Sequence, residues 1–144
     1  MTISKSGISL IKQFEGFRAK AYRCSAGVLT IGYGHTLDVN VNDTVTEERA
    51  TQFLEMDLRH AQDTVEVLVT QNLSQAQYDA LVSFVFNVGS GNFRKSTMLK
   101  KINQGDFAGA SGEFMRWTKA KGKELPGLVK RRAAEKKLFD GAKA

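Results

Sequence analysis

The sequence contains few of the residues that form disulfides, bind metals or interrupt helices and strands. Among its 144 residues there are one cysteine, one proline and two histidines. A single cysteine excludes an internal disulfide and any metal site made from several cysteines. With only His35 and His60, a zinc site would need carboxylates to complete its ligands. We therefore expect neither a metal nor another cofactor.

Long hydrophobic runs are also missing. Lys5 and Lys12 interrupt the N-terminal segment, which lacks the unbroken apolar core of a signal peptide. No stretch approaches the roughly 18 apolar residues that indicate a transmembrane helix. The sequence therefore predicts a soluble cytoplasmic protein that has no export signal of its own.

The positive charge is concentrated at one end of the chain. The net charge is +6, and residues 119–144 hold nine Lys and Arg but only three Asp and Glu. This distribution indicates an anionic partner, such as a cell-wall polymer, a lipid surface or nucleic acid. Nucleic acid is the poorest of these, because the aromatic residues follow core periodicity and are not interleaved with the basic run. A basic helix around Lys130, Arg131 and Arg132 is either a solvated face or a contact for an anionic wall or lipid.

The first 46 residues change from a helical to an alternating pattern. Apolar spacing predicts a helix over about residues 4–15 that ends at Gly16, with Glu15 on its apolar edge. Alternation over 20–36 predicts a hairpin around the Ser25-Ala26-Gly27 connection. Such a hairpin pairs Cys24 with Val28 and Tyr22 with Thr30. It places Cys24 and Thr30 on one face, within roughly 7–8 Å.

The rest of the chain has helical patterns. Polar residues that can cap helices occur at four positions, and a proline can begin a last helix: Thr46, Ser74, Ser96, Asp106 and Pro126. We expect a mainly helical α+β fold in a single domain over 1–144. A small β-hairpin lobe over about 1–46 would lie beside a larger helical lobe over about 47–144, with a cleft between them.

The hairpin segment resembles the active-site signature of the phage-type lysozymes, the endolysins with which tailed phages cut peptidoglycan. That signature reads Glu, eight residues, Asp, five residues, Thr, and then runs into Gly-x-Gly-His. Glu15, Cys24 and Thr30 keep the spacing and run into Gly32-Tyr33-Gly34-His35. Cys24 stands where the family has Asp. Two later stretches, 77–99 and 116–135, also resemble family motifs, so the likeness covers nearly the whole chain.

The resemblance implies a lysozyme-like fold and assigns roles to individual residues. Glu15 would be the general acid, Thr30 would hold the water, and Cys24 would replace the Asp nucleophile or base. The resemblance also implies saccharide contacts at four positions: Thr36, Phe86, Ser96 and Ser111. Asn87 and Trp117 are either sugar contacts or simple core and cap residues.

The reaction implied is hydrolysis of the β-1,4 bond between N-acetylmuramic acid and N-acetylglucosamine, leading to host cell lysis. We expect a monomer, held in the host cytoplasm until a separate holin-like partner releases it to the wall. Two alternatives remain. A lytic transglycosylase would use Glu15 alone, and a catalytically impaired wall-binding relative would follow from Cys24. A thiol with a reference pKa of ~8.5 is mostly protonated at neutral pH unless it is assisted. Arg23 is expected on the other face, so the sequence shows no certain helper.

Overall fold

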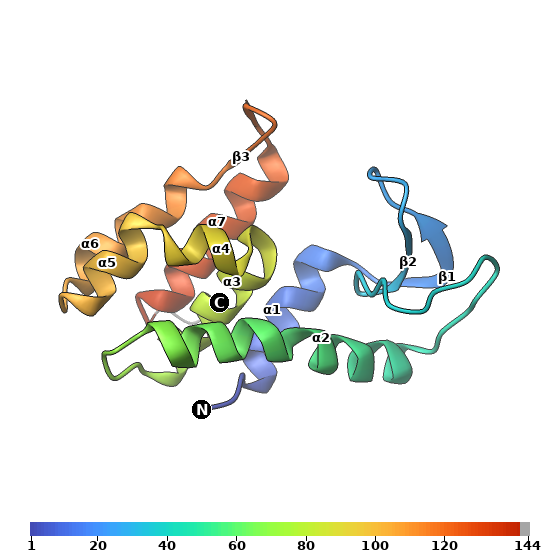
Figure 1. Cartoon of the computed structure of the whole chain (residues 1–144), viewed down its shortest axis with the longest axis horizontal. Helices are drawn as coiled ribbons and strands as arrows, with labels where there is room; N and C mark the ends of the chain where they lie inside the picture. The colour runs from blue at the N-terminus through green and yellow to red at the C-terminus, as the bar shows by residue number, and fades with distance from the viewer. Residues whose placement is uncertain (142–144) are drawn as a thin grey trace. The chain divides into compact units, whose positions relative to one another are not determined.

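The computed structural model describes residues 1–141 and is mainly helical, with short hairpins (Figure 1). It divides into two compact units. The hairpin unit is Ser9–Arg59, and the helical unit holds Met1–Ile8 and the described residues from His60 onward. The boundaries fall inside α1 (Lys5–Glu15) and α2 (Glu47–Leu68). The predicted fold class, mainly helical with a small β-hairpin, is confirmed.

The hairpin of the hairpin unit has the predicted pairing. Strands β1 (Arg18–Arg23) and β2 (Leu29–Gly32) are antiparallel, with Tyr22 opposite Thr30. The Cys24 amide donates to the Val28 carbonyl oxygen at 3.0 Å, which extends the ladder to the connection. The segment that follows is a loop rather than a third strand, and it joins β1 through one isolated bridge between Lys20 and Thr44.

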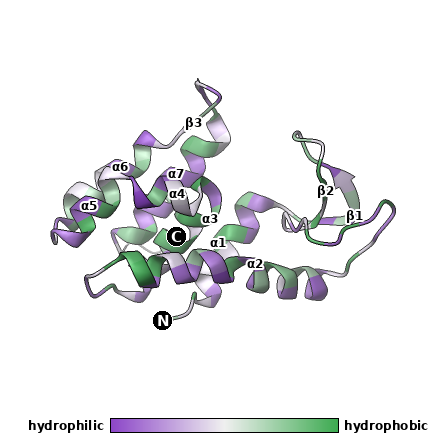
Figure 2. Cartoon of the chain, in the orientation of Figure 1, coloured by the Kyte–Doolittle hydropathy of each residue, from purple (hydrophilic) through white to green (hydrophobic). Residues whose placement is uncertain are grey.

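The first part of α2 contributes buried apolar side chains to the core of the hairpin unit. Thr46 caps α2, because its Oγ1 accepts from the Arg49 amide at 3.1 Å. The α2 ribbon alternates between hydrophobic and hydrophilic bands in Figure 2, as expected of a helix with one buried face. A Cβ at Gly32 would lie 2.9 Å from the Ala50 Cβ, so glycine permits β2 to approach α2 closely. The buried apolar side chains of this unit are Leu10, Ile11, Ile31, Tyr33, Ala50, Leu54 and Leu58.

The helical unit is built around α3. Its other regular elements are α4 (Ser90–Arg94), α5 (Thr97–Asn103), α6 (Phe107–Glu113), the 3-10 turn η1 (Phe114–Arg116) and α7 (Pro126–Phe139). Ser74 and Gln77 form the predicted capping box of α3 (Gln75–Val88). All residues from Tyr78 to Val85 are buried, so α3 forms the centre of this core. Phe84 meets Phe114 edge-to-face, with ring centroids 5.3 Å apart.

A second hairpin was not anticipated. Strands β3 (Lys119–Ala120) and β4 (Lys123–Glu124) pair around Lys121 and Gly122, which have φ values of 52° and 77°. A two-residue loop with positive φ at both positions is the preferred connection of tight hairpins. The segment is polar and very short, so it has no alternating apolar pattern by which strands are recognised. Within residues 1–141, none of the helices has the length and apolarity needed to cross a bilayer.

The prediction that Lys130, Arg131 and Arg132 form a solvated basic face is wrong for two of the three. Arg131 is 4% exposed and Arg132 0% exposed, whereas Lys130 is exposed. Both arginines pair with Glu135, itself 0% exposed, and Arg131 Nε lies 3.3 Å from its Oε2. Their i, i+4 and i, i+3 spacing to Glu135 lets the charges pair within α7. The buried charges are therefore part of the core.

Candidate active site

Glu15 is the last residue of α1 and is half-buried. Gly16, with φ of 74°, ends the helix by donating its amide to the Lys12 carbonyl oxygen at 2.9 Å. The carboxylate lies against the backbone of the Gly-Tyr-Gly-His segment, since a Cβ at Gly34 would be 3.2 Å from Glu15 Oε1. Gly34 also has φ of 82°, so both its backbone conformation and the nearby carboxylate favour glycine.

Cys24 and Thr30 come together on the hairpin as the alternation predicts. Thr30 is buried at 4% exposure, and Cys24 is a half-buried free thiol. Hydrogen bonds from the backbone N–H groups of Val28 and then Ala26 lower the pKa of the Cys24 thiol. Its partial burial opposes this effect, and the Thr30 hydroxyl lowers the pKa further. The hairpin connection thus supplies the assistance to the thiol that the sequence did not reveal.

The Thr30 hydroxyl has one proton and two nearby acceptors. In the structure it donates to the Val28 carbonyl oxygen at 2.9 Å. It stabilises a Cys24 thiolate only when it turns from that carbonyl toward the sulfur. Arg23 donates Nη1 to the Gly27 carbonyl oxygen at 3.0 Å, and so braces the connection. The thiolate is therefore favoured mainly by backbone donors.

A polar cluster that sequence patterns did not reveal supports the Gly-Tyr-Gly-His segment. Tyr33 donates its hydroxyl to Glu47 Oε2 at 2.7 Å, and Thr51 donates to the same oxygen at 2.8 Å. Lys12 Nζ lies 3.2 Å from that oxygen. These bonds hold the pKa of Glu47 near 2, while burial and Glu47 raise the pKa of Tyr33 to about 12. The cluster ties together α1, the segment after β2 and the start of α2.

His35 is held by contacts inside the hairpin unit. It is 4% exposed and its Nδ1 lies 2.8 Å from Asp57 Oδ2. Its ring stacks on Phe53, with centroids 4.2 Å apart. His35 thus pairs with a carboxylate of its own unit and joins the segment after β2 to α2.

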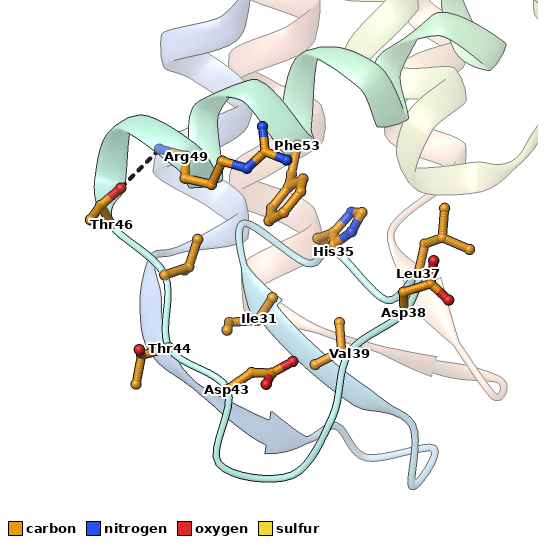
Figure 3. A pocket seen from close by; sticks show the side chains of 11 residues that line it. Ile31, His35, Leu37, Asp38, Val39, Asp43, Thr44, Thr46, Arg49 and Phe53 are labelled. Carbon is orange, nitrogen blue, oxygen red and sulfur yellow. Dashed lines mark hydrogen bonds between the residues drawn. The ribbon is translucent and has the colours of Figure 1, made fainter.

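A pocket of about 460 Å³ opens in the hairpin unit beside this histidine (Figure 3). Ile31, Val39 and Phe53 form apolar walls, and Asp43 lies on the loop that covers the pocket. Glu15, Cys24 and Thr30 are absent from its lining. The pocket is therefore a space beneath the loop and is separate from the chemistry-bearing residues.

The residues predicted to bind saccharide differ in what their side chains can offer. Thr36 and Asn87 are exposed and Phe86 is half-buried, so each has surface to present. Ser96 caps α5: its Oγ accepts from the Leu99 amide at 3.1 Å and donates to the Phe93 carbonyl oxygen at 2.7 Å. Ser111 is 4% exposed and donates to Asp140 Oδ1 at 2.6 Å. Ser111 therefore joins α6 to the end of α7 and is not positioned to meet a sugar.

Comparison with known proteins gives the site its context. The phage lysozyme family model matches residues 12–135, which include Glu15, Cys24 and Thr30. The chain belongs to the phage lysozyme family. The endolysin of Acyrthosiphon pisum secondary endosymbiont phage 1 is 51% identical over 146 residues, covering 99% of this chain and 100% of the relative.

A second relative and a solved structure are also similar to this chain over nearly its whole length. The endolysin of Bacillus phage B103 is 46% identical over 142 residues, covering 96% of this chain but 54% of its own length. The chain therefore spans about half of that relative. The muramidase domain of SpmX from Asticaccaulis excentricus has a TM-score of 0.91 and 41% identity, covering 96% of this chain and 97% of that one. The expected lysozyme-like fold is thereby confirmed.

Metal ligands do not gather in this phage lysozyme within residues 1–141. No group of three or more His, Cys, Asp or Glu side chains there could hold an ion. The chemistry available at the site is that of a carboxyl group, a thiol of lowered pKa and a buried hydroxyl.

Proposed function

We propose that this phage lysozyme hydrolyses the β-1,4 bond between N-acetylmuramic acid and N-acetylglucosamine of peptidoglycan, with Glu15 as general acid and Cys24 as general base. The observation that supports this assignment is the place of the half-buried Cys24 thiol on the same hairpin as Thr30, where backbone N–H groups of Val28 and Ala26 also lower its pKa. A thiolate supplies the negative charge that the carboxylate would supply. Family membership supports peptidoglycan as the substrate.

The proposed reaction proceeds by two proton transfers. The Glu15 carboxyl protonates the bridging oxygen, the bond from C1 to that oxygen breaks, and the leaving sugar departs with a new hydroxyl. A water held by Thr30 adds its oxygen to C1 and gives a proton to the Cys24 thiolate. Proton exchange with solvent then returns the carboxyl and the thiolate. In the productive form of the enzyme Glu15 is protonated and Cys24 is a thiolate. A lowered thiol pKa therefore increases the fraction of enzyme molecules that are in this form.

Saccharide binding is proposed at Thr36, Phe86 and Asn87. Ser96 can add only a remaining lone pair of its hydroxyl, because its proton already goes to the Phe93 carbonyl oxygen. We retain Ser96 as an acceptor and exclude Ser111, whose buried proton goes to Asp140.

The proposal includes how the enzyme reaches its substrate. It acts as a monomer, stays in the host cytoplasm until a holin-like partner opens the membrane, and uses neither a cofactor nor nucleic acid. Contact with an anionic lipid or wall surface falls to lysines of the β3–β4 hairpin, because Lys119, Lys121 and Lys123 are exposed. Arg131 and Arg132 are buried and do not contribute.

Loss of turbidity of purified peptidoglycan tests the activity, and Glu15→Gln tests the acid. The amide keeps the shape but has no acidic proton, so lysis should fall by about 10²–10⁴-fold. Glu48→Gln, an exposed glutamate of the same unit, is the matched control and should lyse normally.

The products distinguish the alternatives. Hydrolysis gives fragments that carry the mass of added water, whereas a lytic transglycosylase gives anhydro-muramic ends. Mass analysis showing anhydro ends would replace the hydrolytic proposal. Wall binding without loss of turbidity would identify a catalytically impaired relative.

A further inference from the structure

Arg132 is a buried cation that bonds to Asn87 and Trp117, two residues that line the same surface groove. It is 0% exposed, and its guanidinium lies 5.0 Å from the centroid of the Phe84 ring. Its Nη1 donates to Glu135 Oε1, its Nε donates to the Trp117 carbonyl oxygen at 3.0 Å, and its Nη2 donates to Asn87 Oδ1. Each bond uses a different nitrogen, so the guanidinium has one fixed orientation.

This contact determines which way the Asn87 amide faces. A guanidinium only donates hydrogen bonds, so the amide atom that meets Arg132 must be the oxygen. The Asn87 NH₂ group then points away from Arg132, and Asn87 is an exposed residue near the C-terminal end of α3. Asn87 therefore presents its two N–H donors to a ligand, while Arg132 occupies one lone pair of its oxygen.

The groove beside Asn87 is suited to an acceptor. It measures about 390 Å³ and is lined by Asn87, Val88, Asn92, Trp117, Lys119, Ala120, Leu125 and Leu128. Lys119 adds a second donor that cannot accept. Val88, Leu125 and Leu128 provide apolar surface for a small methyl-bearing or backbone group. Asn92 has the opposite orientation, because its Nδ2 donates to the Val88 carbonyl oxygen at 2.7 Å and its amide oxygen is left to accept.

We propose that Arg132 is a positioning residue that makes Asn87 a donor, and that this groove selects an amide carbonyl of the substrate. This inference rests on the proposed function, because it names which part of the glycan the helical unit recognises. Two parts of peptidoglycan carry such a carbonyl: the acetamido group of a sugar and the backbone of a stem peptide. A group that can only donate, such as the ammonium of a de-N-acetylated sugar, would meet like polarity and be rejected.

Binding measurements on a background that cannot turn substrate over test the proposal. The Glu15→Gln protein is titrated with a peptide-free N-acetylated oligosaccharide, with the same oligosaccharide after de-N-acetylation, and with a muropeptide before and after removal of its peptide. We expect about tenfold tighter binding of the carbonyl-bearing member in at least one pair, the size of one well-placed hydrogen bond. The pair that shows the preference identifies the acetamido or the peptide carbonyl as the ligand.

Two variants then test the positioning role. Asn87→Asp places an acceptor outward and should abolish the preference, or reverse it for the ammonium-bearing sugar. Arg132→Lys keeps a buried positive charge but replaces three separate donor nitrogens with one, so the Asn87 amide is no longer fixed and the preference should shrink toward onefold. Asn72→Asp, an exposed asparagine of the same unit outside the groove, should leave the preference unchanged.

Three results would overturn the inference: no preference in either pair, an unchanged preference in Asn87→Asp, or an Arg132→Lys protein that loses thermal stability but keeps the full preference. The proposed function fails separately. An enzyme that shows the binding preference but releases nothing from peptidoglycan would refute hydrolysis and leave the selection of a carbonyl intact.

Discussion

Glu47 in the hairpin unit and Glu135 in the helical unit both accept hydrogen bonds from several side chains, yet their pKa values shift in opposite directions. Tyr33, then Thr51 and Lys12, lower the pKa of Glu47 to about 2. Burial raises the pKa of Glu135, although Arg132 and Arg131 oppose it. The number of hydrogen bonds does not decide the direction. Contact with water does, because desolvation penalises the charged form.

The two units use ionisable groups differently as a result. Glu47 and Cys24 of the hairpin unit stay near solvent, where local hydrogen-bond donors lower their pKa values. In the helical unit Glu135 and the two arginines are withdrawn into the core, where they fix geometry. A group near solvent can exchange protons with its surroundings, whereas the buried Glu135 and its two arginines orient the side chains around them.

The strongest test of this contrast removes the buried charge. Glu135→Gln leaves Arg131 and Arg132 buried without their carboxylate, and should lower the free energy of unfolding by about 3–5 kcal/mol. Denaturant unfolding measures this loss. Lys130→Gln, on the exposed side of the same helix, should change it by no more than about 0.5 kcal/mol. Similar losses in both variants would contradict the assignment of Glu135 to the core.

The second test concerns the thiol. With Cys24 as base, lysis should decline as pH falls through the thiol pKa, because the thiolate is lost. Cys24→Asp should retain or raise activity and move this acidic limb toward lower pH, since Asp ionises near ~3.9. Cys24→Ser carries no charge at working pH and should lose about 100-fold. pH–rate profiles on purified peptidoglycan measure both effects, and a Cys24→Ser enzyme of full activity would show that the thiol only packs.

We expect Glu47 to make the stability of the folded protein depend on pH in the acid range. Its folded pKa of about 2 is below the unfolded value near ~4.3, so its contribution is present above ~4.3 and is lost as pH falls toward 2. Thermal unfolding of Glu47→Gln should therefore show a shallower decline over that range than the parent protein. Glu48→Gln is the control, and parallel curves for all three proteins would show that Glu47 carries no such linkage.

The smallest effect is expected from exposed charge. Changing Lys121 and Lys123 together to Gln should lower lysis of whole cells a few-fold at low salt and less at physiological ionic strength, where screening already weakens attraction. Hydrolysis of a soluble oligosaccharide should stay constant. The pair Lys5 and Lys100, exposed elsewhere, controls for net charge. Equal losses on both substrates would refute a role in encounter.

Local patterns were sufficient for much of this molecule. The capping residues Thr46 and Ser74 and the register of Tyr22 with Thr30 depend on neighbours a few positions away, and all were predictable. The burial of Arg132 was not, because it depends on partners 15 and 45 residues distant. The backbone donors to Cys24 were missed for another reason. They depend on how the connection turns, which residue types alone do not specify.

Gly34 has a consequence for how this enzyme can change over generations. The wall that meets the Glu15 carboxylate there is bare main chain, so no side chain at position 34 can adjust the acid without displacing it. In the proposed mechanism, substitutions that tune the chemistry are therefore expected at position 24 of the hairpin, whereas Glu15 and Gly34 are expected to stay fixed.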